Sequence, residues 1–318
     1  MADRIQMWID CDPGNDDAEA IMVALSLPNV DVLGISCVNG NANVDQCCRN
    51  TLRVLRACGR EEIPVFRGST LSLLDAGDCI PDSAHGIDAL GDAPDVIIPD
   101  MSLLKPEHGV NALVKAVNQH PGEISLVALG PLTSVAMAVR MDADFRKKVK
   151  DLTVMGGNTN GRGNITLCGE FNFAMDPEAA CIVLNSMECP ILILTADICE
   201  EHPLTQTWMK ERLSVGTEKA KFVSAISVVL IKYSENIYGL GKDSPYICWD
   251  SLAMVARLCK DAIVESVQHY ATVELHGKLT RGQMVVDWYD KLNKPKNVNI
   301  IKKLNMDIIK EMLIQSVK

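Results

Sequence analysis

Apolar and polar positions alternate with two different periods along the first two thirds of the chain. Short apolar runs are typical of strands that are buried on both faces of a sheet. Between them lie longer stretches whose apolar residues recur every three or four positions, as in an amphipathic helix. The predicted strands cover 5–9, 32–38, 63–66, 124–128, 152–155 and 191–194. The predicted helices cover 18–27, 43–58, 110–117, 132–139, 176–184, 217–239, 249–258 and 306–317.

This alternation predicts an α/β fold with a mostly parallel, Rossmann-like central sheet flanked by helices. No repeat, low-complexity tract or linker divides the 318 residues, so a single domain over residues 1–318 is expected. The stretches 69–101 and 240–245 break the pattern and are expected to be loops, whereas 264–298 resembles strands and turns. In such a fold the active site is expected at the C-terminal ends of the strands.

Four aspartates, Asp10, Asp12, Asp16 and Asp17, fall within eight positions directly after the first predicted strand. Carboxylates this close together repel one another, and a fold retains them when a positive charge lies among them. Oxygen ligands suit a hard divalent cation, so the cluster predicts a metal site at the carboxyl end of that strand. A helix-capping acidic turn would account for one or two of these carboxylates, but not for four.

Two other motifs share part of this acidic pattern. An EF-hand loop requires a third ligand where Gly14 stands and a glutamate where Ile21 stands, so that interpretation fails. The run Asp10-Cys11-Asp12 after an apolar strand also resembles the nucleophile motif of haloacid-dehalogenase-type (HAD-type) phosphatases. That motif carries threonine or valine at the position of Gly14, and the phosphatase is kept as an alternative enzyme class.

Polar or glycine-rich residues also follow other predicted strands, at 39–41, 129–133 and 156–158. The carboxyl ends of parallel strands share one edge of a sheet. We therefore expect these loops and the acidic cluster to converge on one crevice, which is a stronger indication of a site than any single motif.

Two further groups of residues are candidates for the same crevice. Asn164, Glu170 and Asn172 offer amides and a carboxylate that can bind hydroxyl groups, but their spacing alone favours a solvated loop. Trp249 and Asp250 open a predicted helix, where aspartate is favoured by the helix dipole and tryptophan is more often a core residue. Spacing alone assigns neither group to the site.

The composition restricts the class of binding partner more than it restricts the choice of fold. The chain is 47% hydrophobic and 23% charged, and its net charge of −10 argues against a nucleic-acid partner and favours a cation or a small neutral substrate. The twelve cysteines include no C-x-x-C pair, and neither a signal-peptide pattern nor a membrane-spanning apolar stretch is found. A reduced, cytoplasmic protein without a membrane partner is expected.

Motifs along nearly the whole chain resemble those of one enzyme family. The run 10–18, Asp-Cys-Asp-Pro-Gly-Asn-Asp-Asp-Ala, is similar to the signature of the nucleoside hydrolases, also called nucleoside N-ribohydrolases. Further motifs of that family recur in order at 40–41, 129–133, 155–157, 163–164, 170–172, 176–180 and 285–287. The resemblance implies an enzyme that hydrolyses the bond between ribose and a nucleobase.

The resemblance also implies a bound Ca²⁺, a ligand set and an oligomer. The implied metal ligands are Asp12, Asp17, Asp250 and the backbone carbonyl of Leu129, with Asp10 orienting them from a second layer. The residues implied to bind the substrate are Asp16, Asn41, His85, Met155, Asn164, Glu170, Asn172 and Asp250. A homodimer or homotetramer is the implied assembly.

The implied chemistry follows from the charge that develops during cleavage. Breaking the ribose–base bond builds positive charge on the sugar, which nearby carboxylates stabilise. Ca²⁺ would orient the attacking water and lower its pKa, with Asp12 as general base. Stacking on Trp249 would raise the basicity of a purine and favour protonation at N7. The leading hypothesis is a purine nucleosidase acting on inosine and guanosine, with adenosine as a further candidate.

The sequence leaves two other functions open. The purine-specific branch has a second tryptophan in the loop after the third strand, whereas 69–101 contains none. The run 84–90 instead resembles the His-Gly-x-x-Gly-Leu motif of the broad-specificity branch, with Ala89 in place of a glycine. A broad inosine–uridine hydrolase with His85 as the acid is therefore an alternative. A catalytically inactive nucleoside- or ribose-binding protein is another.

Overall fold

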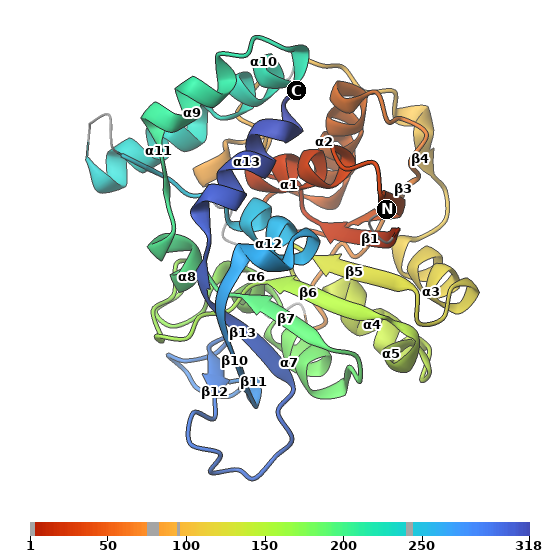
Figure 1. The fold of residues 1–318 in the computed structure, drawn as a ribbon. Helices are drawn as coiled ribbons and strands as arrows, with labels where there is room; N and C mark the ends of the chain where they lie inside the picture. Colours follow the sequence, from red (N-terminus) through yellow and green to blue (C-terminus); the bar gives the residue numbers. More distant parts are fainter. Residues whose placement is uncertain (1–3, 75–82, 94–95, 240–243) are drawn as a thin grey trace.

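The apolar runs form the strands of one central sheet, which the computed structural model describes through residues 4–74, 83–93, 96–239 and 244–318 (Figure 1). The strand order is β10 (Ile263–His269), β13 (Val298–Leu304), β7 (Ile191–Leu194), β6 (Asp151–Met155), β5 (Ile124–Ala128), β1 (Ile5–Cys11), β2 (Val30–Cys37), β3 (Val65–Arg67) and β4 (Leu104–Lys105). Neighbouring strands are parallel, except that β10 pairs antiparallel with β13 at one edge. The predicted mostly parallel α/β sheet is confirmed.

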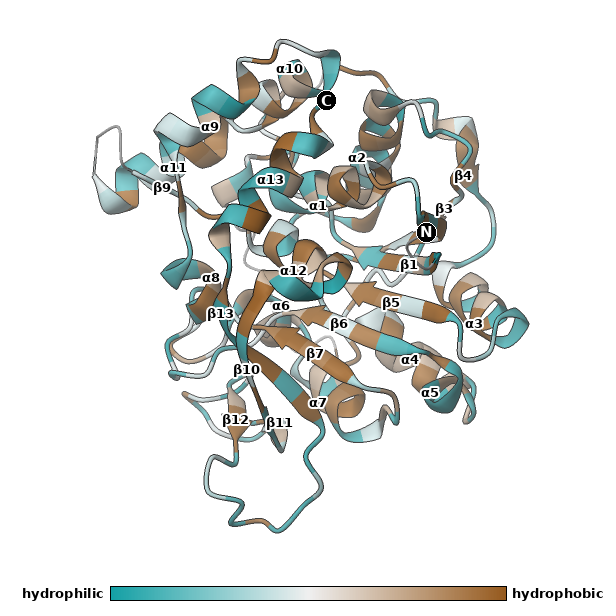
Figure 2. Cartoon of the chain, viewed as in Figure 1, coloured by the Kyte–Doolittle hydropathy of each residue, from teal (hydrophilic) through white to brown (hydrophobic). Residues whose placement is uncertain are grey.

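Helices cover both faces of this sheet, as the amphipathic pattern predicts (Figure 1). One face carries α1 (Asn15–Leu25), α2 (Val44–Cys58), α9 (Gln206–Leu213), α10 (Glu218–Ile226), α12 (Trp249–Leu258) and α13 (Met306–Ser316). The other carries α3 (Gly109–Gln119), α4 (Thr133–Met141), α5 (Phe145–Lys148) and α7 (Pro177–Ser186). Hydrophobic residues predominate in the central strands (Figure 2). None of the helices described is both long and apolar enough to cross a bilayer.

Local signals fix where several of these helices begin and end. The Asn43 side chain accepts a hydrogen bond from the backbone N–H of Gln46 (3.0 Å) and so caps the start of α2. Gly59 ends the same helix in the left-handed region at φ 64°, where a side chain would be strained. Asp176 caps α7, and Pro177 occupies its first turn, where the missing N–H costs nothing.

The single helix predicted over 217–239 is wrong, because the chain forms α10 and then α11 (Val228–Tyr238) with a break at Ser227. Side-chain contacts explain the break. The carbonyl of Ile226 accepts a hydrogen bond from the Asn15 side-chain amide (2.6 Å), and the Ser227 hydroxyl donates to the carbonyl of Val223 (2.7 Å). Such bonds compete with the helix ladder and bend it.

The irregular stretches contain short elements that the hydrophobic pattern did not predict. They are η1 (Ser83–His85), η2 (Met101–Leu103), α6 (Phe171–Met175), α8 (Ala196–Glu201), β8 (Leu204–Thr205), β9 (Pro245–Tyr246) and η3 (Lys260–Ala262). The strands and turns predicted for 264–298 are present and include β11 (Ala271–Val273) and β12 (Met284–Val286). Parts of the two predicted loops, 75–82, 94–95 and 240–243, lie outside the described residues. The described part of 69–101 is mostly irregular, as expected, whereas Pro245 at the end of the second predicted loop belongs to β9.

Candidate active site

The ends of four central strands meet at a small cavity of about 50 Å³. Asp12 follows β1, Asn41 follows β2, Leu129 follows β5, and Met155 ends β6. The described residues that line the cavity are Asp12, Asp16, Asn41, His85, Leu129, Met155, Asn164, Glu170, Phe171, Asn172, Trp249 and Asp250. The structure therefore brings together all eight residues that the family resemblance implied would bind substrate, at the sheet edge where the strand-end loops were expected to converge.

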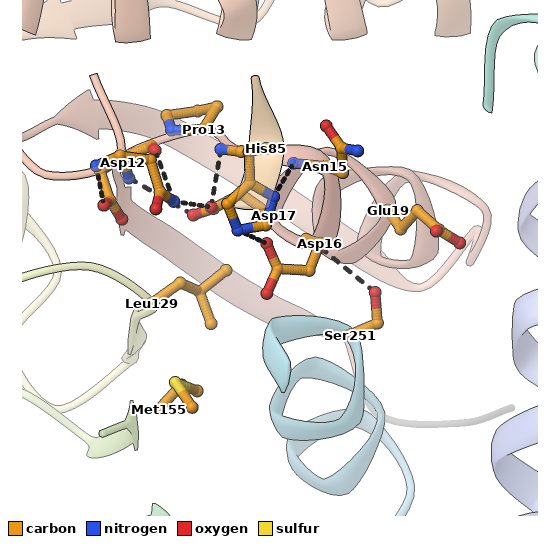
Figure 3. A network of polar contacts seen from close by, with 12 residues as sticks. Asp12, Pro13, Asn15, Asp16, Asp17, Glu19, His85, Leu129, Met155 and Ser251 are labelled. Atoms are coloured by element: carbon orange, nitrogen blue, oxygen red, sulfur yellow. Dashed lines mark hydrogen bonds and ion pairs between the residues drawn. The ribbon is translucent and has the colours of Figure 1, made fainter. Parts of the chain in front are cut away.

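Three carboxylates form a tight cluster beside this cavity. One oxygen atom from each of Asp16, Asp17 and Asp250 lies within 4.8 Å of the others, and all three residues are buried. Asp16 and Asp17 occupy the first turn of α1, while Asp250 occupies the first turn of α12. These two helices pack against each other, which brings their N-terminal turns and their carboxylates together. Figure 3 shows Asp16 and Asp17 pointing from the start of α1 toward this region.

Asp12 lies next to the cluster and is held by the neighbouring strand ends. One of its carboxylate oxygens accepts the backbone N–H of Asn41 (2.8 Å). A Cβ atom at Gly40 would lie 2.0 Å from one carboxylate oxygen of Asp12, and a Cβ at Gly130 would lie 2.3 Å from the other. Both positions therefore require glycine, because any side chain would collide with this carboxylate.

Burial and mutual repulsion disfavour the charged forms of these acids in the metal-free protein. Burial, followed by repulsion from Asp16, raises the pKa of Asp17 to about 7. Burial, followed by repulsion from neighbouring aspartates, raises the pKa values of Asp12 and Asp250 well above their usual range. A divalent cation would remove this penalty, and an all-oxygen donor set suits a hard cation.

The carbonyl of Leu129 and the carboxyl of Asp10 lie behind the cluster. The Leu129 carbonyl faces the cavity and accepts a hydrogen bond from the Asn172 amide (2.7 Å), which leaves one lone pair for a further partner. Leu129 is positioned through its N–H, which donates to the Asp10 carbonyl (2.9 Å). The Asp10 carboxyl accepts from the Ser36 hydroxyl, and burial raises its pKa to about 7.

The polar residues on the opposite wall are held by backbone hydrogen bonds. The Glu170 carboxylate accepts the N–H groups of Gly157 (2.7 Å), Asn172 (3.0 Å) and Phe173 (3.1 Å) and thereby caps α6. Burial nevertheless raises its pKa to about 7. The Asn164 side chain accepts from the N–H of Phe171 (2.8 Å). The solvated-loop interpretation of this segment is therefore wrong for Glu170 and Asn172, which are both buried.

His85 reaches the cavity from η1 and contacts the acidic loop through both ring nitrogens (Figure 3). Its Nδ1 accepts the backbone N–H of Asn15 (3.3 Å), so the neutral ring carries its proton on Nε2. Nε2 lies 3.7 Å from the Asp16 oxygen that has no hydrogen-bond partner among the described residues. The ring is therefore oriented toward Asp16 by the backbone of the metal-site loop.

Trp249 separates this cavity from a second one of about 170 Å³, which is lined mainly by aromatic and aliphatic side chains. Asn164, Phe171 and Trp249 line both cavities, so the two spaces adjoin. The walls of the second cavity come largely from α11, which contributes Tyr233 and Tyr238. A sugar-sized polar space next to a larger apolar space suits a nucleoside.

Sequence reasoning missed the residues of this second cavity. Phe171 lies within the family motif 170–172, but the sequence predicts no role for it, for Glu200 or for the tyrosines of α11. The apolar positions Leu230, Tyr233 and Ile237 fall on one face of α11, a spacing that equally indicates a core-facing helix. That stripe was the one available signal.

Comparison with known proteins agrees with this geometry. Residues 7–311 match the family described as inosine-uridine preferring nucleoside hydrolase. The chain is 30% identical to a pyrimidine-specific ribonucleoside hydrolase of Salmonella arizonae, with 98% of this chain and 97% of that protein covered. It is 36% identical over 234 residues to probable uridine nucleosidase 2 of Oryza sativa subsp. japonica, covering 73% of this chain and 68% of that protein.

A solved structure extends the agreement to the whole fold. An inosine-guanosine nucleoside hydrolase superposes with a TM-score of 0.91 at 28% identity, and the match covers 99% of this chain and 98% of that one. The family match decides against the HAD-type phosphatase alternative. The polar cavity at the strand ends is thus the candidate active site of an enzyme, and the chain belongs to the nucleoside hydrolase family.

Proposed function

We propose that this nucleoside hydrolase cleaves purine ribonucleosides, inosine and guanosine above all, into free base and ribose. The observation that carries the proposal is the position of Trp249, whose side chain lines both the polar cavity and the apolar one. A base in the apolar cavity would contact the indole ring while its ribose occupies the polar cavity. Stacking on an aromatic ring contributes about 1–3 kcal/mol per base.

Calcium is the cation that we propose for the acidic cluster. Asp12, Asp17, Asp250 and the Leu129 carbonyl would hold it, and Asp16 lies close enough to the other carboxylates to bind it or the ribose. The bound cation would supply charge that favours ionisation of the attacking water. The oxygen-only donor set and the unpaired buried carboxylates support this assignment.

The chain's own residues would carry the proton and orient the sugar. Asp12 would accept a proton from the attacking water, because its carboxylate faces the cavity and its position is fixed by Asn41. Glu170 and Asn172 would bind ribose hydroxyls from the opposite wall. The surrounding carboxylates would stabilise the positive charge that develops on the sugar.

The leaving base is the point on which purine and pyrimidine nucleosides differ. Contact with Trp249 would favour protonation of a purine at N7, a position that pyrimidines lack. In the alternative inosine–uridine mechanism, His85 would donate the proton. The Asn15 N–H donates to Nδ1 of His85, and Nε2 faces Asp16, so the described contacts direct the ring toward the acidic cluster and favour the Trp249 mechanism. Because one relative is named as pyrimidine-specific, the assay that tests the proposal also includes pyrimidine nucleosides.

A reducing-sugar assay with inosine, guanosine, adenosine, uridine and cytidine, without added phosphate, tests the proposal. We expect release from the 6-oxopurine nucleosides and almost none from the pyrimidine nucleosides. Trp249→Leu should lower kcat/KM for inosine by about ten- to a hundredfold, whereas Trp288→Leu, at an exposed tryptophan far along the chain, should not. Equal rates on uridine and inosine would support the His85 mechanism, and no release from any nucleoside would indicate a binding protein.

A further inference from the structure

The second cavity holds a single charged side chain among its described lining residues, and that side chain is Glu200 on α8. The remaining walls are formed chiefly by aromatic and aliphatic groups, including Phe171, Tyr233, Tyr238 and Trp249. Planar rings of this kind fix the plane of a base but do not distinguish one base from another. A carboxylate among them can discriminate, because it accepts hydrogen bonds and donates none when ionised.

Within the described part of the chain, the Glu200 carboxylate makes no hydrogen bond or ion pair. The charged groups that act on it are Asp197 on the same helix and Arg162. Partial burial, followed by repulsion from Asp197, raises the pKa of Glu200. The charge of Glu200 in turn raises the pKa of Tyr238 on the opposite wall, after burial of that tyrosine. Glu200 therefore faces the space between α8 and α11 without a partner to satisfy it.

We propose that Glu200 selects 6-oxopurine nucleosides by accepting hydrogen bonds from the base, an inference that rests on the proposed function. Hypoxanthine carries a proton on N1, and guanine carries a proton on N1 and an adjacent amino group. Guanine can thus donate to both carboxylate oxygens at once. Adenine offers only its C6 amino group, beside an N1 lone pair that repels the second oxygen. The expected order of preference is guanosine, then inosine, then adenosine.

Glu200→Gln tests this role because it changes the hydrogen-bonding pattern and keeps the shape. A glutamine presents one acceptor and one donor, which matches the amino group and N1 of adenine. The ratio of kcat/KM for guanosine to that for adenosine should fall by about ten- to a hundredfold, because one bidentate pair contributes about 1–3 kcal/mol of discrimination. The ratio is internal to each preparation, so partial unfolding of the variant does not alter it.

Glu201→Gln is the matched control, since Glu201 is the next residue on α8 and is exposed like Glu200, but does not line the cavity. The control should keep the wild-type ratio. An unchanged ratio in Glu200→Gln, an equal change in Glu201→Gln, or a wild-type preference for adenosine would overturn the role of Glu200. If the wild type cleaves no purine nucleoside, the proposed function itself fails, which is a different result from cleavage with an unchanged ratio.

Discussion

The two adjoining cavities are built in different ways. The polar cavity is formed at the ends of the central strands and the first turns of α1 and α12, and six of its twelve described lining side chains form hydrogen bonds with backbone groups. The apolar cavity is formed largely by α11 and the chain around β9, with mainly aromatic and aliphatic lining side chains and a single residue, Glu200, from α8. Trp249 belongs to both.

Under the proposed function, the reaction takes place in the polar cavity, whereas the choice of nucleobase depends on the apolar cavity. A misplaced carboxylate in the polar cavity would change the charge around the sugar, so the geometry there is constrained by Gly40 and Gly130 as well as by the aspartates. Under the proposed function, substitutions on α8 or α11 would change the surface presented to the base and leave the strand ends in place. Relatives named for pyrimidine, uridine or inosine-guanosine substrates fit this division, since all match this chain over most of its length.

The strongest test of this difference between the cavities is to replace Asp12, the proposed general base in the polar cavity. Asp12→Asn should lower kcat on inosine by about 10²- to 10⁴-fold, the range for loss of a general base. Thermal unfolding should change little, because asparagine keeps an oxygen for the Asn41 N–H and removes a repulsive charge. Ribose release and a melting curve measure the two effects.

Asp144→Asn is the control for this experiment, because Asp144 is exposed and remote from the strand ends. Its kcat should equal that of the wild type. A fall of less than about tenfold in Asp12→Asn would assign the proton transfer to another carboxylate.

The effect of calcium, measured as a gain in the free energy of unfolding, should be smaller. Calcium at about 100 times its Kd should raise the free energy of unfolding of chelator-treated protein by about 2.7 kcal/mol. The gain should disappear in Asp17→Asn, which removes one carboxylate from the cluster, and persist in Asp144→Asn. Urea unfolding with and without calcium measures it. A wild type that is insensitive to calcium, or an undiminished gain in Asp17→Asn, would contradict the assignment.

The smallest expected effect is that of substituting His85, whose role differs between the Trp249 mechanism and the inosine–uridine mechanism. His85→Gln keeps a donor and an acceptor, but they share one terminal amide and cannot take the positions of both ring nitrogens, so one of the contacts to Asp16 and to the Asn15 N–H is lost. The loss of one hydrogen bond should lower kcat/KM for inosine by about tenfold. Uridine, where it is cleaved at all, should be affected by the same factor. A collapse of kcat on uridine alone would show that His85 is the acid, and Trp249 would lose its proposed role.

The polar cavity could be predicted from the sequence because its signals are local. Asp12, Asp16 and Asp17 follow a recognisable strand, and a parallel sheet places all strand ends at one edge. Asn164, Glu170 and Asn172 could not be placed from spacing, and their assignment depended on the family motifs. Glu170 and Asn172 are buried where Glu170 caps α6, a helix too short to produce a periodic pattern.

The apolar cavity could not be predicted because its residues are joined by contacts between distant segments. The break at Ser227 depends on the bond from Asn15 to Ile226, which are 211 positions apart. An apolar stripe on α11 has the same pattern whether it faces a core or a cavity. A single acidic residue such as Glu200 resembles any surface glutamate until the opposite wall is known.

The hydrogen bond from the Asn15 side chain to the Ile226 carbonyl has a mechanical consequence. Asn15 begins the helix that carries Asp16 and Asp17, and Ile226 ends the helix that leads into α11. A hydrogen bond of 2.6 Å thus joins the acidic turn directly to the junction between α10 and α11. A movement of the acidic turn would therefore shift the junction between α10 and α11, and with it the start of the helix that lines the apolar cavity.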